Sequence, residues 1–121
     1  MTQAGTARPR RSGPYMGTLP ELTEETLHAL LSSGSQAWVV FTARWCSFGL
    51  LLSARLAGLA PRPGDGWTVG WFDAGRAPEP ARELGVHRIP ALALIEGSRV
   101  VRRWYGADVE IEECLARAHG R

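Results

Sequence analysis

A cysteine that follows an apolar run is the residue of this sequence whose chemistry is easiest to infer. The segment Arg44–Gly49 reads RWCSFG and stands between an apolar run and a helical pattern. A cysteine at a helix N-terminus meets unpaired N–H groups and the positive end of the helix dipole, which both stabilise a thiolate. Because the thiolate is the nucleophilic form, Cys46 is the candidate catalytic residue.

A redox site of this kind normally carries a second cysteine three residues after the first, and that position is Gly49 here. Disulfide reduction takes two steps: thiolate attack gives a mixed disulfide, and a second thiol then releases the product. Cys46 can supply the first step. The other cysteine, Cys114, shares a predicted helical face with Ile111 and Leu115, and free cysteines are among the most buried residues. We therefore expect Cys114 to be structural.

The composition describes one soluble domain. The chain has 121 residues, of which 45% are hydrophobic and 21% charged, a size that suits a single core. No apolar run reaches the roughly 20 residues that cross a bilayer, and no apolar segment follows Arg10 and Arg11 as a signal peptide requires. Two widely spaced cysteines do not form a disulfide framework. These features predict a cytoplasmic protein.

Charge and histidine patterns predict no other chemistry. The 14 basic residues, all arginine, are scattered among 12 acidic ones, so the net charge is only +2 and no nucleic-acid partner is expected. His28, His87 and His119 stand singly, without metal-ligand spacing to either cysteine. No glycine-rich phosphate loop follows a strand. We expect no metal, cofactor or membrane partner.

Hydrophobic periodicity gives the elements of the first half of the chain. Residues 1–19 lack periodicity and contain several Gly and Pro, which predicts a disordered extension; residues 20–121 are predicted to form the domain. A helix is expected to begin after Thr23 as its N-cap and to end at Gly34. The run Ala37–Ala43 predicts a strand that is buried on both faces.

A second helix is expected after Cys46, closed by the prolines that follow it. Further predicted elements are a strand over 67–73, a short helix within "APEPARELG", a hairpin with strands 91–96 and 99–105, and a C-terminal helix capped by Asp108. This order implies a mixed sheet with helices on both faces. The apolar face predicted for the second helix comprises Phe48, Leu51, Leu52, Leu56 and Leu59.

This arrangement resembles the thioredoxin family over about residues 20–118. Trp45 and Cys46 stand at the first strand-to-helix junction, and Ile89-Pro90 precedes a strand. The resemblance implies an α/β fold, the thioredoxin-like three-layer sandwich, in which helices flank a central mixed β-sheet.

The resemblance also implies roles for individual residues. Cys46 would be the nucleophile, Trp45 the aromatic residue beside it, and Pro90 a cis-proline packed against the thiol. The backbone of Ile89 would be free to pair with an extended polypeptide. The peptide-binding groove implied in this way comprises Trp45, Phe48, Ile89, Pro90 and Ala91.

The sequence departs from the family at the positions that complete its reaction. The second cysteine is Gly49, the buried carboxylate six residues before the nucleophile is Val40, and the partner lysine falls near Val69 or Gly70. In the family, the carboxylate assists proton movement when the second thiol attacks. The joint loss of the second thiol and the carboxylate makes chemical sense. A buried carboxylate that no longer assists proton transfer only adds its desolvation cost to the fold.

These departures leave three functions open. The first is a single active-site thiol that forms mixed disulfides with protein or low-molecular-weight thiols in redox homeostasis: at most a monothiol thiol-disulfide oxidoreductase, and a poor dithiol reductase. The second is a redox-inactive binding module or assembly chaperone that uses the groove beside the cis-proline. The third is a monothiol glutaredoxin, whose Cys-Gly-Phe-Ser motif shares residue types with "CSFG", although Trp45 favours thioredoxin. We expect a monomer whose partner is a client protein or a small thiol.

Overall fold

The computed structural model describes residues 19–59, 67–106 and 113–114. The predicted disordered extension and most of the predicted C-terminal helix lie outside these residues. Leu19, the first described residue, is buried in the core.

Five strands form one mixed sheet in the order β2-β4-β3-β5-β6. The strands β2 (Glu21–Leu22), β4 (Trp67–Asp73) and β3 (Gln36–Thr42) are parallel, whereas β5 (Ala91–Glu96) is antiparallel to both β3 and β6 (Arg99–Tyr105). The bounds of β4, β5 and β6 are those predicted, and β3 differs by one residue at each end. The sequence does not predict β2, because two residues are too few to show a period-two pattern.

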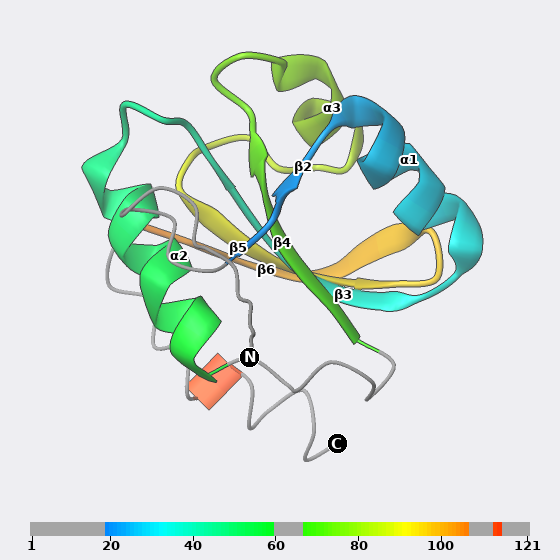
Figure 1. The fold of residues 1–121 in the computed structure, drawn as a ribbon. Helices are drawn as coiled ribbons and strands as arrows, with labels where there is room; N and C mark the ends of the chain where they lie inside the picture. Colours follow the sequence, from blue (N-terminus) through cyan, green and yellow to red (C-terminus); the bar gives the residue numbers. More distant parts are fainter. Residues whose placement is uncertain (1–18, 60–66, 107–112, 115–121) are drawn as a thin grey trace, which may run out of the picture.

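Within the described residues, α1 (Glu24–Ser33), α2 (Ser47–Leu59) and α3 (Pro78–Glu83) cover the two faces of the sheet. Figure 1 shows α1 and α3 on one side and α2 on the other. The predicted three-layer α/β architecture is therefore confirmed. In the part of the chain that the structure describes, no helix has the length and apolar character needed to cross a bilayer.

The first helix begins and ends where its sequence predicts. The Thr23 Oγ1 accepts a hydrogen bond from the N–H of Thr26 at 3.1 Å, and the Thr26 Oγ1 accepts one from the N–H of Thr23 at 2.6 Å. This reciprocal cap satisfies two backbone donors that have no partner inside the helix. Gly34 then ends α1 with a φ of 76°, a left-handed conformation that glycine adopts without steric cost.

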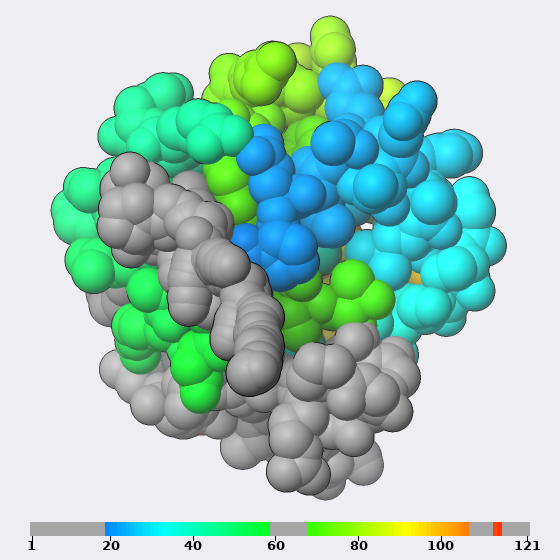
Figure 2. All heavy atoms as spheres, viewed as in Figure 1, coloured from blue at the N-terminus to red at the C-terminus, as the bar shows by residue number. Residues whose placement is uncertain are grey.

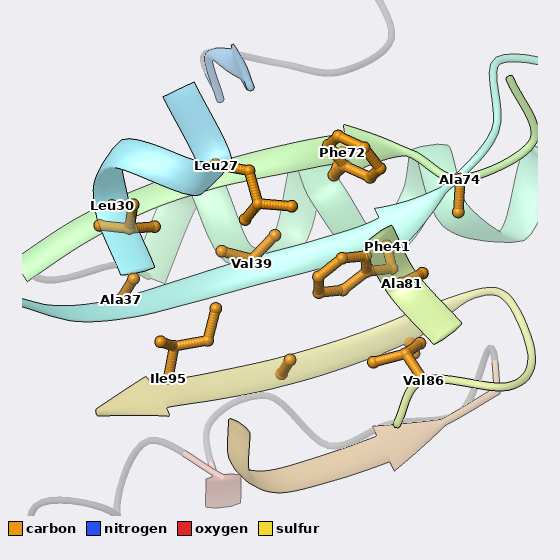
Figure 3. Packing of buried hydrophobic residues seen from close by; sticks show 12 residues of the cluster. Leu27, Leu30, Ala37, Val39, Phe41, Phe72, Ala74, Ala81, Val86 and Ile95 are labelled. Carbon is orange, nitrogen blue, oxygen red and sulfur yellow. The ribbon is translucent and has the colours of Figure 1, made fainter. Parts of the chain in front are cut away.

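Successive side chains of β3 pack into two separate cores, because side chains alternate across a strand. Trp38 and Val40 belong to the cluster on the α2 side, whereas Ala37, Val39 and Phe41 belong to the cluster beneath α1 and α3. Figure 3 shows the second cluster, in which leucines of α1 lie over side chains of β3 and β4. Burial on both faces explains why β3 reads as a continuous apolar run.

The second helix buries only part of the face predicted for it: Leu52 and Leu56 are buried as predicted, whereas two other members of that face are exposed. Phe48 and Leu51 are 57% and 63% exposed, which contradicts their assignment to the apolar face. The segment around them is apolar on every side, so periodicity alone does not choose the face that meets the sheet. The residues that α2 buries over this stretch recur at i, i+3, i+4 and i+7: Gly49, Leu52, Ser53 and Leu56.

Candidate thiol site

Cys46 lies immediately before α2, at the position the sequence predicts. Its N–H donates to the carbonyl of Ala43 at 3.0 Å, and its carbonyl accepts from the N–H of Leu50 at 3.1 Å. These bonds hold the cysteine in the turn that opens the helix. Cys46 is a free cysteine and, as a residue, is partly exposed.

Cys114 takes part in no disulfide either, and it is buried. It packs in the cluster on the α2 side together with Trp38, Leu56 and Trp71. The expectation that Cys114 is a buried, structural cysteine agrees with this position, and the two cysteines form no disulfide.

Three connecting segments meet at the end of the sheet where β3 and β4 finish and β5 begins, and Cys46 lies in one of them. Thr42 is in register with Asp73, and Phe41 is in register with Ala91. The segments that follow β3 and β4 and the one that precedes β5 therefore emerge side by side. In the third of them the Ile89–Pro90 peptide bond is cis, and the Pro90 carbonyl accepts a hydrogen bond from the N–H of Gly106 at 3.0 Å.

Gly75 allows the turn after β4 to pack directly against the segment before Cys46. A Cβ added at Gly75 would lie 2.6 Å from the Cβ of Ala43 and 3.1 Å from the Nε1 of Trp45. Trp45 is 75% exposed, but its indole nitrogen lies beside this turn. The backbone of Gly75 therefore takes part in positioning the residues that flank the thiol.

We expect Gly75→Ala to lower the free energy of unfolding by about 1–3 kcal/mol, because Ala43 is fully buried and cannot move aside without disturbing the core. Urea unfolding measures this loss. The double variant Ala43→Gly/Gly75→Ala removes the closest contact and should recover part of the stability. If Gly75→Ala unfolds at the same urea concentration as the wild type, the close approach does not constrain the turn.

Arg44, the charged residue nearest to Cys46 in sequence, is engaged with other groups. Its Nη2 lies 2.6 Å from the Oε1 of Glu21 and its Nε lies 3.6 Å from the Oδ2 of Asp73. Its guanidinium also stands 5.3 Å from the ring centroid of Trp71. Figure 2 shows the β2 segment, in blue, at the surface beside the blue-green segment that leads into α2. Arg44 therefore connects the segment between β3 and α2, which contains Cys46, to residues of β2 and β4.

The residues predicted to form a peptide groove separate into exposed and buried groups. Trp45 and Phe48 are exposed, and Leu51, which the sequence places on the buried face, joins them at the surface. We call these three side chains the apolar ridge. Within α2, the spacing of three residues between Phe48 and Leu51 is the signal that identifies them as neighbours on one helix face.

On the other side of the predicted groove, Ile89 is half-buried and Pro90 is buried. Ala91 is fully buried in the cluster beneath α1 and α3 and is paired with Phe41 and Tyr105. The prediction that Ala91 lines a groove is therefore wrong. Its position at the first residue of a central strand explains the burial.

A separate cavity of about 280 Å³ lies near the N-terminus of α1 and is lined by none of the predicted site residues. Asp73 contributes the most buried carboxylate of its wall, and its Oδ1 accepts a hydrogen bond from the N–H of Arg76 at 3.2 Å. Acidic and basic side chains both face this space. The lining residues are Glu21, Leu22, Thr23, Glu24, Phe72, Asp73, Arg76 and Ala77.

Sequence and structural similarities agree with this geometry. No family model matches the chain. The chain is 34% identical, over 92 residues, to the bifunctional thioredoxin reductase/thioredoxin of Mycobacterium leprae (strain TN); the match covers 75% of this chain but only 20% of that protein. The chain thus spans about a fifth of the length of this curated relative.

Solved thioredoxins have the same fold. A mutant thioredoxin from Halobacterium salinarum NRC-1 superposes with a TM-score of 0.65 at 22% identity, over 83% of this chain and 85% of that chain. Thioredoxin of Fasciola hepatica gives a TM-score of 0.67 at 23% identity, over 82% of this chain and 98% of its own. Its strand order and these structural neighbours give the chain the thioredoxin fold, and its sequence similarity supports a relation to the thioredoxin family.

Proposed function

We propose that this protein uses Cys46 as a single active-site thiol that forms mixed disulfides with a client protein or a low-molecular-weight thiol. The observation that supports this most directly is a free, partly exposed cysteine at the start of α2, with a buried glycine at position 49. Cys46 directly precedes a 13-residue helix, whose first N–H groups have no partner inside the helix.

The proposed reaction is one thiol–disulfide exchange. The Cys46 thiolate attacks one sulfur of a partner disulfide, a new S–S bond forms, and the other partner sulfur leaves as a thiolate that takes up a proton. No net oxidation occurs in this step. A second exchange, with a thiol from solution such as glutathione, then frees Cys46 as a thiolate and leaves the partner joined to that thiol.

Poor dithiol reductase activity follows from the place of the other cysteine. Cys114 is buried in the cluster on the α2 side, so its thiol is shielded from a mixed disulfide formed at the surface. We propose a cytoplasmic location, because a chain with two widely spaced cysteines and no disulfide between them suits a reducing compartment. We propose that the protein acts there as a monomer.

Oxidised glutathione provides the direct test. We expect intact-protein mass spectrometry to show one glutathione adduct per folded chain, located at Cys46 by peptide mapping and removed by excess dithiothreitol. Cys46→Ser should form no adduct, whereas the matched Cys114→Ser variant should react like the wild type. Labelling of Cys114 alone, or insulin reduction as fast as that of a two-cysteine thioredoxin, would contradict the proposal.

The apolar ridge supports a second candidate function, a binding module or assembly chaperone. Trp45, Phe48 and Leu51 are all exposed large apolar residues in the stretch around the start of α2, and exposed aromatic residues are frequent anchors at protein interfaces. A client held in this way would stay bound to Cys46→Ser in the presence of dithiothreitol and be lost from Phe48→Ala. The opposite pattern, loss from Cys46→Ser and retention by Phe48→Ala, supports the thiol function instead.

A further inference from the structure

We propose that Thr42 determines the single-thiol character of the site, because it occupies the space that any side chain at position 49 would need. This inference rests on the proposed function for its chemical meaning, but its steric basis is independent of it. A Cβ built on Gly49 would overlap the Oγ1 of Thr42 and would lie only 2.5 Å from the Cβ of Thr42. Real Cβ atoms essentially never approach another atom closer than 3.0 Å.

Rotation of the Thr42 side chain does not relieve this conflict. A change of χ1 moves Oγ1 and Cγ2, but Cβ is attached to the backbone and stays where it is. The Cγ2 of Thr42 would itself lie 3.1 Å from the added atom, so its present position is also a tight one. Relief therefore requires a shift of the β3 backbone or of α2.

The backbone at Thr42 is held in place. Thr42 is the last residue of β3, is fully buried, and pairs in register with Asp73 of β4. Its carbonyl accepts a hydrogen bond from the N–H of Ala74 at 2.7 Å. A shift of Thr42 would disturb the pairing between the ends of β3 and β4, close to the site.

The helix α2 is also held in place, by the packing of its buried leucines. Leu52 and Leu56 are 1% and 0% exposed and pack in the same cluster as Trp38 and Val40 of β3. Moving the first turn of α2 outward by the necessary distance would pull these leucines from the core. Close-packed interiors resist such changes, so insertion of even one carbon at a tight position is costly.

The role of Thr42 is steric and not polar. Its Oγ1 is buried and, within the described residues, has no hydrogen-bond partner. An unsatisfied buried hydroxyl is a cost to the fold, not a gain. Thr42→Val, which keeps the shape and removes the hydroxyl, should therefore retain the exclusion of a side chain at position 49.

A second thiol at position 49 consequently requires two substitutions. We would compare Gly49→Cys with Thr42→Gly/Gly49→Cys, both carrying Cys114→Ser, after oxidation in a glutathione buffer. The fraction of chains with a disulfide between Cys46 and the introduced thiol should be at least ten times higher in the double variant. Alkylation of the remaining thiols and intact-protein mass spectrometry measure this fraction. Formation of this disulfide to the same extent in both chains would overturn the proposal.

The stability of alanine variants tests the same contact without any thiol chemistry. Gly49→Ala should lower the melting temperature by about 5–15 °C in the wild-type background. With Thr42→Gly in place, the same change should lower it no further, and with Thr42→Ala only part of the loss should be recovered, because the Cβ of residue 42 remains.

Gly58 provides the matched control in the same helix. A Cβ added there has no atom within 4 Å, so Gly58→Ala should raise the melting temperature slightly, as expected for alanine in place of glycine in a helix. If Gly49→Ala behaves like Gly58→Ala, Thr42 does not exclude a side chain. This result would leave the mixed-disulfide function intact, whereas failure of Cys46 to react would leave the steric proposal intact.

Discussion

Val40→Asp should lower the free energy of unfolding by about 3 kcal/mol or more at pH 7, although the thioredoxin family carries a carboxylate at the matching position. Val40 is fully buried, stands in register with Trp71 and Leu92, and packs in a cluster of apolar side chains and Cys114. An ionised carboxylate placed there exchanges water for apolar neighbours without gaining a charged partner.

The loss should grow as the pH rises. Burial disfavours the charged form, so the pKa of the introduced carboxyl lies higher in the folded chain than its value of about 3.9 in the unfolded chain. Below that value the carboxyl is protonated in both states. Above it, only the unfolded chain releases the proton, and stability falls by about 1.4 kcal/mol per pH unit until the folded state also ionises.

Val40→Asn is the matched control, because it introduces a polar group of similar size that does not titrate. Urea unfolding of both variants between pH 4 and pH 8, each compared with the wild type, separates the two contributions. We expect the deficit of Val40→Asn to be independent of pH. If Val40→Asp is as stable as the wild type at pH 7, a compensating group reaches position 40 and the loss of the carboxylate needs another explanation.

The fold could be predicted from sequence because its elements are encoded locally. The reciprocal cap at Thr23 and the left-handed glycine at Gly34 mark both ends of α1, and Gly97, with a φ of 69°, turns the hairpin between β5 and β6. Each signal lies within a few residues of the feature it predicts. The strand β2 has no such signal, since its two residues pair only because β4 offers an edge.

The site could be predicted only in part, because its shape depends on contacts between distant elements. Cys46 is marked by the strand before it and the helix after it. The burial of Ala91, in contrast, follows from its packing in the cluster beneath α1 and α3, which joins elements that are distant in sequence. The contact of Thr42 with Gly49 joins the end of a strand to the first turns of a helix, and no residue pattern reports the distance between them.

Phe41→Ala should lower the free energy of unfolding by about 3–5 kcal/mol, a large share of the roughly 5–15 kcal/mol that stabilises a domain of this kind. Phe41 is fully buried, and its ring centroid lies 5.8 Å from that of Phe72. Figure 3 shows both rings in the cluster that also contains Ala81 of α3. Truncation leaves a cavity that the surrounding strands cannot close.

The same truncation should increase the mobility of the segments at the end of the sheet where Cys46 lies. Phe41 is in register with Phe72 and Ala91, so it is the central member of three paired residues that stand just before or just after the site segments. Amide hydrogen exchange should therefore accelerate in the segments around Cys46 and Pro90, beyond the increase seen in the β5–β6 turn. The melting temperature should fall by about 10–20 °C.

Phe48→Ala is a matched control, because it makes the same substitution in the neighbouring helix α2 at a side chain that is 57% exposed. We expect its effect on the free energy of unfolding to stay within about 0.5 kcal/mol. A comparable loss in both variants would mean that Phe48 packs against the core, and the apolar ridge would then not be available to a partner. A large loss in Phe41→Ala alone, with faster exchange around Cys46, would show that the α1-side core also holds the thiol segment in place.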